Sequence, residues 1–400
     1  MNVGKIKQGV KNPAKALRYI GRRGFEKYEI HKFKQHVLSD EQFIQRYQYY
    51  SVGTPAVTVE YEGERNIPSK LKNYSGEYKS NTQYLFEIND GVLYPPNGVP
   101  VTADGKIIHQ FDMIDLEYYV PRVKSKYDVD PNDFASNIDQ SSSTNTNDRT
   151  LESAFPLGTG FRGGGYCHWF DETLPQLRLF EKYCAEQGEK PSLILPNGLS
   201  SWQANSLKLM GYTEDDYITW GDAPIKARKL LVPTLLLRNS SNRSKFRTNK
   251  EGIEWVADKI KSNVHSDGGS SYSPNIVISR EDANERRVVN HNKLVGKLSE
   301  YGFESYTLAH MDFEEQVKMF KNAKNIIAPH GAGLVNTIFS DQANIIELFP
   351  ESGIQPHYFV LSNELDHSYD FIICENLNKR KDMKVPIKEV VAEINTTQSS

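Results

Sequence analysis

Hydrophobic positions divide the chain into a strand-rich first part and a second part in which strands and helices alternate. Residues 54–62 alternate between apolar and polar side chains, which is the pattern of a half-buried strand. Residues 83–125 are rich in β-forming residues, and Asn-Asp-Gly, Pro-Pro-Asn-Gly and Ala-Asp-Gly sequences predict turns between short strands there. Residues 128–150 carry few apolar side chains and predict a mobile surface loop.

Helical spacing begins after this loop. Apolar side chains recur at helical intervals over residues 166–187 and again over 200–210, and the short apolar run 192–196 between them indicates a buried strand. Residues 230–237 resemble a second buried strand, which passes into a connection at Pro233.

The C-terminal part repeats one strand–helix unit several times. Strands are predicted over 275–279, 304–308, 324–328 and 344–349, and helices over 249–263, 289–300, 312–322 and 332–339. Such alternation implies right-handed crossovers and a mostly parallel sheet that helices cover on both faces. The polar end of the chain after residue 392 is predicted to fray.

Length and composition are those of a globular protein with two cores. The chain has 400 residues, of which 38% are hydrophobic, and single cores usually stop growing near ~250–300 residues. The three cysteines form no Cys-x-x-Cys pair, so we expect reduced thiols in a reducing compartment. Because we find neither a signal peptide nor an apolar run of ~18 residues, we expect the catalytic machinery to be cytoplasmic.

The first 36 residues differ in charge from the remainder. They hold ten Lys/Arg and two Glu, a net charge of +8, whereas the rest of the chain carries −11. One interpretation is a basic amphipathic helix on an anionic membrane surface, which would make the protein peripheral at the inner face of the membrane. The other is a solvated basic arm. Nucleic acid is not an expected partner, because the body is acidic and has no nucleic-acid-binding motif.

A phosphate site is predicted where the strand 324–328 ends. Pro329 stops the ladder, and Gly331 and Gly333 permit unusual backbone angles and close approach of a ligand. The helix that follows offers unpaired N–H groups and a partial positive charge, which favour a phosphate. The alternative is a tight turn that uses glycine only for packing.

Two charged residues at neighbouring strand ends extend this hypothesis. Arg280 follows the strand 275–279, where its guanidinium could grip phosphate oxygens in a bidentate manner, unless it pairs with nearby carboxylates on the surface. Glu347 interrupts an apolar strand and needs partners if it is buried. Ribose hydroxyls would serve as partners, and an edge position facing water is the alternative.

A second site is predicted where a glycine-rich loop, 163–165, opens a helix. His168 and Glu172 are four residues apart and therefore share one helix face. An acid–base site of this kind would take a proton from an attacking hydroxyl, and Glu172, Asp171 or His168 could be that base. The alternative is an acidic residue that interacts with the helix dipole and a histidine that packs under Trp169.

No metal site is expected from the sequence. Asp128-Val129-Asp130 has the Asp-x-Asp form that can hold a divalent cation, but it lies beside a polar loop without a strong strand before it. We interpret it as a chance match. No His/Cys spacing indicates zinc, and no other cofactor is expected.

Three blocks together resemble glycosyltransferase family 61, over roughly residues 160–350. They are Tyr166-Cys167-His168-Trp169 through Leu174-Pro175, Ile278-Ser279-Arg280 with Arg286-Arg287-Val288-Val289-Asn290, and Pro329-His330-Gly331-Ala332-Gly333-Leu334-Val335-Asn336 through Glu347-Leu348-Phe349-Pro350. The sequence departs from the usual pattern in its first block, because Cys167 stands where an aromatic residue is common and Phe170-Asp171 replaces an aliphatic pair.

The resemblance implies an α/β fold of the glycosyltransferase B type, with two Rossmann-like domains facing a cleft and β-rich additions in the N-terminal part. The expected divisions are a basic segment 1–36, an acceptor-side domain 37–245, a nucleotide-sugar-binding domain 246–375 and a C-terminal tail 376–400.

The resemblance also implies an inverting, metal-independent reaction of polysaccharide or capsule biosynthesis. The donor is a nucleotide sugar, and the acceptor is a glycan or a lipid-linked saccharide. The residues that match donor-binding positions are Arg280, His330, Gly331, Ala332, Gly333, Leu334, Asn336 and Glu347. Glu172 matches the acidic position before the Leu-Pro pair and is the first choice for the base, with Asp171 still open. The competing hypotheses are a pyruvyl-transferase-like enzyme and a non-catalytic nucleotide-sugar-binding subunit.

Overall fold

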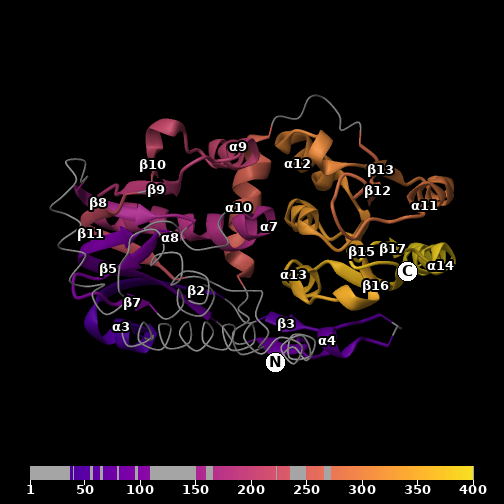
Figure 1. Ribbon diagram of the computed structural model, residues 1–400, viewed down its shortest axis with the longest axis horizontal. Coiled ribbons are helices and arrows are strands. Elements are labelled where there is room, and N and C mark those ends of the chain that lie inside the picture. The colour runs from indigo at the N-terminus through magenta and orange to yellow at the C-terminus, as the bar shows by residue number, and fades with distance from the viewer. Residues whose placement is uncertain are drawn as a thin grey trace, which may run out of the picture.

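A computed structural model describes residues 37–38, 40–54, 57–63, 66–78, 81–94, 98–108, 150–158, 165–221, 223–234, 249–264 and 272–399. The basic segment 1–36, Asp128-Val129-Asp130 and nearly all of the loop predicted over 128–150 lie outside the described residues. Figure 1 shows a strand-rich N-terminal half in indigo and magenta beside a C-terminal half in orange and yellow.

The N-terminal half is built on a mixed sheet. Its strands are β10 (Tyr217–Trp220), β9 (Ser192–Pro196), β8 (Thr150–Pro156), β11 (Ile225–Pro233), β5 (Asn81–Tyr94) and β2 (Gln48–Thr54), in this order, and β6 (Val99–Val101) also pairs with β5. The run from β10 to β11 is parallel, whereas β5 is antiparallel to β11, β2 and β6. Helices α8 (Leu177–Gln187) and α9 (Ser201–Leu209) form connections of the parallel part.

One predicted turn in this half is wrong. β5 runs straight through Asn89-Asp90-Gly91 and pairs with β11 on both sides of it. Gly91 lies so close to Leu230 of β11 that a Cβ atom there would come within 2.7 Å of the leucine Cβ. The glycine is therefore needed for close packing of two strands rather than for a chain reversal. The predicted turn at Gly105, with φ of 75°, is present.

The alternating segment 54–62 forms a small unit of its own. Its strand β3 (Val57–Val59) pairs with β4 (Gly76–Tyr78), which follows the segment, and α4 (Ser69–Lys72) lies between the two strands in sequence. This unit packs on the C-terminal half: the Tyr61 hydroxyl donates to Asp370 at 2.9 Å, and β3 contacts α13 (His357–Glu364). Residues far apart in sequence thus join the two halves.

The C-terminal half contains a sheet that is parallel except at one edge. Its strands are β13 (Glu304–Tyr306), β12 (Asn275–Ile278), β14 (Asn325–Pro329), β15 (Asn344–Pro350), β16 (Ser368–Asn376) and the antiparallel β17 (Met383–Lys384), in this order. The first four strands in this series were all predicted, each to within two residues. The first strand of this sheet in the sequence is β12. The next strand, β13, lies on one side of β12, and β14 lies on its other side, so the strand order reverses between β12 and β14.

Alternating side chains place helices on both faces of this sheet. Val277 and Ile327 face α11 (His291–Leu298) and α14 (Ile387–Ser399), whereas Ile276 and Ala328 belong to the core on the side of α12 (Phe313–Asn322) and α13. The segment 376–400, expected to be a tail, is largely part of the domain. Its helix buries two apolar side chains one turn apart, Val390 and Ile394.

The two halves share one hydrophobic core. Phe170 stacks on Phe313 with ring centroids 5.3 Å apart and also contacts Phe339 and Trp202. Helix α10 (Lys250–Asn263) packs against elements of both halves and lies between them in Figure 1. The α/β class is confirmed, while two Rossmann-like domains in a glycosyltransferase B arrangement stay a prediction.

Two further expectations concern the cysteines and the absence of a membrane-spanning helix. Cys167, Cys184 and Cys374 form no disulfide bond in the structure. Across the described ranges, each helix is too short or too polar to traverse a lipid bilayer.

His367 connects the helix after the predicted phosphate turn to the start of β15. Its Nδ1 accepts the Ala343 N–H at 3.1 Å and its Nε2 contacts the Thr337 carbonyl at 3.0 Å. Burial lowers the pKa of His367 to about 4, against the opposing effect of the hydrogen bond to Thr337. Protonation would also place a second N–H on Nδ1, facing the Ala343 donor.

This histidine should make folding stability depend on pH. The folded pKa lies below the ordinary value of 6.5, so the unfolded chain takes up the proton first as the pH falls. We expect the contribution to be complete above pH 6.5 and to decrease towards pH 4, by up to roughly 3 kcal/mol. Chemical unfolding across this range should show a flatter pH profile for His367→Gln than for the wild type. Parallel profiles would contradict this assignment.

Candidate active site

Two of the predicted residues lie at the point where the C-terminal sheet switches direction. Arg280 follows β12 by two residues, and His330 follows β14 directly. Crevices at the carboxyl ends of strands beside such a switch are the usual ligand sites of parallel sheets. The structure also brings Arg280 against Gly331, where the methyl group of an alanine would collide with the guanidinium Nη1.

The turn after β14 opens towards solvent at its tip. His330 and Gly331 are buried, whereas Ala332 is exposed and Gly333 is partly exposed. The 3₁₀ helix Ala332–Phe339 makes its first hydrogen bond from the Leu334 N–H to the Gly331 carbonyl, so the N–H groups of Ala332 and Gly333 precede the helical bonding pattern. These amides are available to an anion at the helix start.

The expectation of unusual backbone angles at this turn is wrong. Gly331 has φ of 177° and ψ of 164°, an extended conformation that any residue adopts. The requirement for glycine is instead steric. Arg280 fills the space of a side chain at Gly331, and Leu308 fills it at Gly333.

Arg280 is a partly buried cation that does not pair with the neighbouring acidic side chains. Its Nη2 donates to the Glu285 backbone carbonyl at 3.3 Å, and the Glu285 carboxylate instead binds Arg286 at 2.6 Å. Within the described part of the chain, Arg280 forms no ion pair, and its buried Nε has no hydrogen-bond partner. Burial and the charge of Arg286 lower the pKa of Arg280. An anionic ligand would relieve both effects.

His330 is held by a buried carboxylate. Glu347 is fully buried, and its two oxygens contact His330 Nδ1 at 2.5 Å and accept from the Tyr369 hydroxyl at 2.7 Å. The imidazole also stacks on Phe349, with ring centroids 5.4 Å apart. Because both carboxylate oxygens already have partners, the geometry indicates that Glu347 orients His330. Glu347 therefore has no exposed carboxylate oxygen for the predicted contact with a ribose.

The predicted helix 166–187 has the expected extent but an irregular middle. It begins as α7 (Tyr166–His168), widens into a π-helical turn (Trp169–Thr173), tightens into a 3₁₀ turn (Leu174–Gln176) and continues as α8. Pro175 has no N–H for the usual helical bond and crowds the preceding turn, which accounts for the change of register. Turns of π-helix occur frequently at functional sites, and both candidate carboxylates lie on this one.

Among the candidate base residues, His168 and Glu172 contact each other, and Asp171 has a different partner. His168 Nδ1 lies 3.3 Å from Glu172 Oε1, which confirms that these side chains share a face. Asp171 is fully buried, and its Oδ2 lies 2.7 Å from Nε2 of His357, a residue of α13 in the other half of the chain. Trp169 is buried and its indole N–H donates to Ser206 at 2.9 Å.

A buried polar network ties the two sites together. The Tyr166 hydroxyl donates to Asn336 Oδ1 at 2.7 Å, and the Asn336 amide donates to Gln316 at 2.9 Å. Asn336 is fully buried. Its position indicates a role in joining the halves rather than direct contact with a donor.

The sequence profile of the family described as glycosyltransferase 61 matches residues 166–346. The chain carries a glycosyltransferase 61 domain. It is a transferase enzyme, and the matched range runs from the first residue of α7 into β15, so it includes the elements that carry both candidate sites. Among curated proteins, no match to this glycosyltransferase is found.

Three site residues of the glycosyltransferase were not singled out by sequence reasoning. His357 and Tyr358 lie on α13, whose helical spacing was not recognised because nearly all of its side chains are buried and no polar face marks a period. Arg286 is part of the second motif but was not predicted as a site residue. It has φ of 58° and lies near enough to Arg280 to lower the pKa of Arg280. A non-glycine residue at positive φ is rare, but sequence alone does not reveal it.

The steric role of Gly331 gives a direct prediction for the glycosyltransferase. We expect Gly331→Ala to displace the Arg280 guanidinium and to weaken nucleoside diphosphate binding by roughly 10–100-fold, the loss of a charge-assisted hydrogen bond. Isothermal titration calorimetry would measure it. Gly296→Ala is the matched control, because a Cβ there meets nothing within 4 Å. Equal binding by both variants would contradict the packing of Arg280 on the turn.

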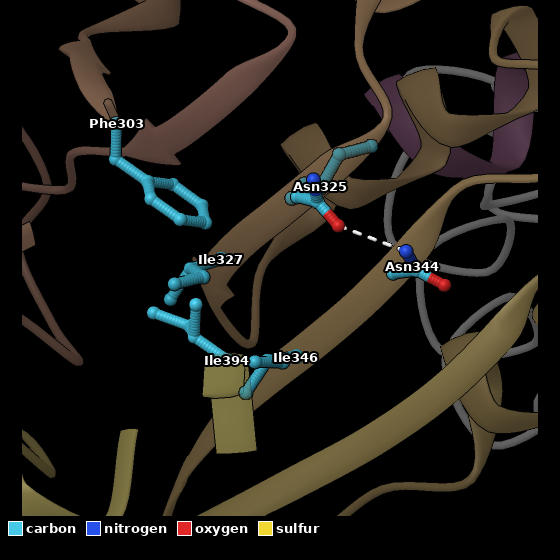
Figure 2. A pocket seen from close by; sticks show the side chains of 7 residues that line it. Phe303, Asn325, Ile327, Asn344, Ile346 and Ile394 are labelled. Atoms are coloured by element: carbon cyan, nitrogen blue, oxygen red, sulfur yellow. Dashed lines mark hydrogen bonds between the residues drawn. The ribbon is translucent and has the colours of Figure 1, made fainter. Parts of the chain in front are cut away.

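A small pocket near the amino ends of the C-terminal strands, opposite to the ends that carry Arg280 and His330, does not belong to this site. Figure 2 shows Phe303 and Ile394 beside it, with Asn325 and Asn344 at the amino ends of β14 and β15. The Asn344 amide donates to Asn325 Oδ1 at 2.8 Å, and Asn325 donates in turn to Asn275. This asparagine ladder fixes the register of three parallel strands, so we interpret the pocket as a packing feature.

Proposed function

We propose that the protein is an inverting glycosyltransferase that moves a sugar from a nucleotide-sugar donor to a glycan or lipid-linked saccharide acceptor in polysaccharide biosynthesis. No divalent cation is needed on the donor diphosphate in this proposal. The two halves correspond to the two domains of a glycosyltransferase B fold, with the donor on the C-terminal half.

The single observation that carries this proposal is the arrangement of Arg280 against the open turn at Gly331. Among the described residues, the partly buried Arg280 guanidinium has no carboxylate partner, and it packs against Gly331, just before the amides of Ala332 and Gly333 at the helix start. Fixed donors of this kind stabilise charge that develops as a diphosphate leaves. His330, oriented by Glu347, would add a hydrogen-bond donor, and the hydrophobic side chain of Leu334 secures the helix start.

Glu172 is the proposed general base. Both acidic candidates are buried, but Asp171 contacts His357, whereas Glu172 contacts the partly exposed His168. The base takes the acceptor hydroxyl proton while that oxygen attacks the anomeric carbon and the bond to the diphosphate breaks. Inversion follows because the nucleophile enters opposite the leaving group.

A screen of nucleotide sugars tests the proposal. A donor at 100 times its dissociation constant should raise the free energy of unfolding by about 2.7 kcal/mol, which thermal shift detects. With an acceptor present, the same donor should release a nucleoside diphosphate. Binding without release under any acceptor would favour the non-catalytic subunit, and turnover without a sugar nucleotide would favour a pyruvyl-transferase-like enzyme.

We also propose that residues 1–36 contact the membrane surface that bears the acceptor. Vesicle co-sedimentation tests this contact.

A further inference from the structure

A cluster of metal-binding side chains lies between the two halves, beside the proposed base. Cys167 Sγ is 3.5 Å from His357 Nε2 and 3.9 Å from Asp171 Oδ2, and that oxygen is 2.7 Å from the same His357 nitrogen. His168 Nδ1 is 4.0 Å from the sulfur. The ligand atoms of Cys167, His168 and Asp171 all lie within 4.8 Å of one another.

We propose that Cys167, Asp171 and His357, together with His168, form a zinc site that joins the two halves of the chain. Zinc takes Cys sulfur at about 2.3 Å and His nitrogen or carboxylate oxygen at about 2.0–2.2 Å, so neighbouring ligand atoms of a tetrahedral site are about 3.3–3.6 Å apart. The contact of Cys167 with His357, at 3.5 Å, lies in this range, whereas its contacts with Asp171 and His168, at 3.9 and 4.0 Å, would shorten on binding. The short edge between His357 and Asp171 would lengthen by about 0.6 Å on binding.

The geometry favours metal coordination over a proton relay. In a Cys-His-Asp relay, the carboxylate and the thiol bind opposite nitrogens of the imidazole. Here the sulfur and the carboxylate oxygen both approach Nε2 of His357. A cation at the centre would bind the sulfur, the oxygen and the nitrogen together.

The surroundings of the cluster also favour a cation. Asp171 is fully buried and His357 nearly so, while Cys167 and His168 are partly exposed and give access. Tyr358, the next residue on α13, is buried beside them. A thiolate with imidazole and carboxylate ligands is the donor set of zinc rather than of magnesium or calcium.

The site would be structural and separate from the donor diphosphate. Four protein ligands leave zinc no open position for a phosphate, so the proposed transfer remains independent of a cation on the donor. Zinc would hold His168 and Asp171, which leaves Glu172 as the acidic group for catalysis. It would also fix α13 against the π-helical turn.

The sequence could not reveal this site, because its ligands are far apart in the chain. His357 follows Cys167 by 190 positions and lies on a different half. The first three ligands span five residues with an uninformative spacing. Only the packing of α13 against α7 brings the fourth ligand into place.

The experiment uses the full chain, loaded with Zn²⁺ and then desalted, and does not depend on a donor or on turnover. Elemental analysis should find one zinc per chain, and X-ray absorption of the wild type should find one sulfur neighbour at about 2.3 Å with nitrogen or oxygen at the other positions. The Co²⁺-substituted protein should show a thiolate-to-cobalt charge-transfer band. A wild type that stays folded without retaining zinc, or zinc without a sulfur neighbour, would overturn the proposal.

Matched variants identify the ligands. Cys167→Ser should abolish the charge-transfer band, and Cys184→Ser should leave it unchanged, because Cys184 lies on α8 outside the cluster. His357→Gln should weaken zinc binding by at least the roughly 10–100-fold that loss of an outer-shell partner costs. A charge-transfer band that survives in folded Cys167→Ser protein would refute the assignment.

Discussion

Replacing Glu172 with glutamine is expected to lower turnover by roughly 10²–10⁴-fold, the usual contribution of a general base. Glutamine keeps the size and hydrogen bonding of the side chain but does not accept the acceptor proton. Binding of the nucleoside diphosphate should be unchanged, because Arg280 and the turn at Gly331 are not altered. Steady-state kinetics with a saturating donor and calorimetry with the diphosphate separate these two quantities.

A control on the same helical segment distinguishes chemistry from general damage. Glu186 lies on α8, is exposed and pairs with Lys182 one turn earlier. Glu186→Gln should keep wild-type turnover, since exposed ion pairs of this kind contribute little. Unchanged turnover in Glu172→Gln would remove this residue from the base role.

Loss of the Arg280 side chain is expected to reduce kcat/KM by roughly 10²-fold or more. The guanidinium is proposed to stabilise the departing diphosphate, and removal of one fixed donor to a developing oxyanion costs about 10²–10³-fold. Arg280→Lys should recover part of the loss, because lysine keeps the charge but not the bidentate geometry. Both kcat and diphosphate affinity should fall in Arg280→Ala.

An exposed arginine of the same half provides the comparison. The backbone carbonyl of Arg380 accepts a hydrogen bond from the Arg286 N–H. This contact is made by the backbone and not by the side chain. Arg380→Ala should therefore leave kcat/KM near the wild-type value. If Arg280→Ala and Arg380→Ala behaved alike, with both proteins folded by circular dichroism, the guanidinium would have no part in donor binding.

Much of the C-terminal half could be predicted because its strands are buried on both faces. Mostly apolar strands such as Asn344–Pro350 and helices with a clear amphipathic period give strong local signals. The order of these elements then places Arg280 and the turn at Gly331 at neighbouring strand ends. That arrangement follows from the strand–helix alternation and from the rule for ligand sites in parallel sheets.

The remaining features depend on contacts between distant segments. Gly91 looks like a turn residue until Leu230 of another strand is placed against it, and Glu347 has two partners, His330 and Tyr369, from different strands or turns. The role of Asp171 depends on His357, which local patterns do not connect to it. In each case the decisive partner is set by tertiary packing.

A crystal structure of the full chain with the nucleoside diphosphate of its donor tests the central claim most directly. We expect diphosphate oxygens at about 2.7–3.1 Å from the amides of Ala332 or Gly333 and from the Arg280 guanidinium. A diphosphate bound elsewhere, with this turn and Arg280 left without a ligand, would contradict it.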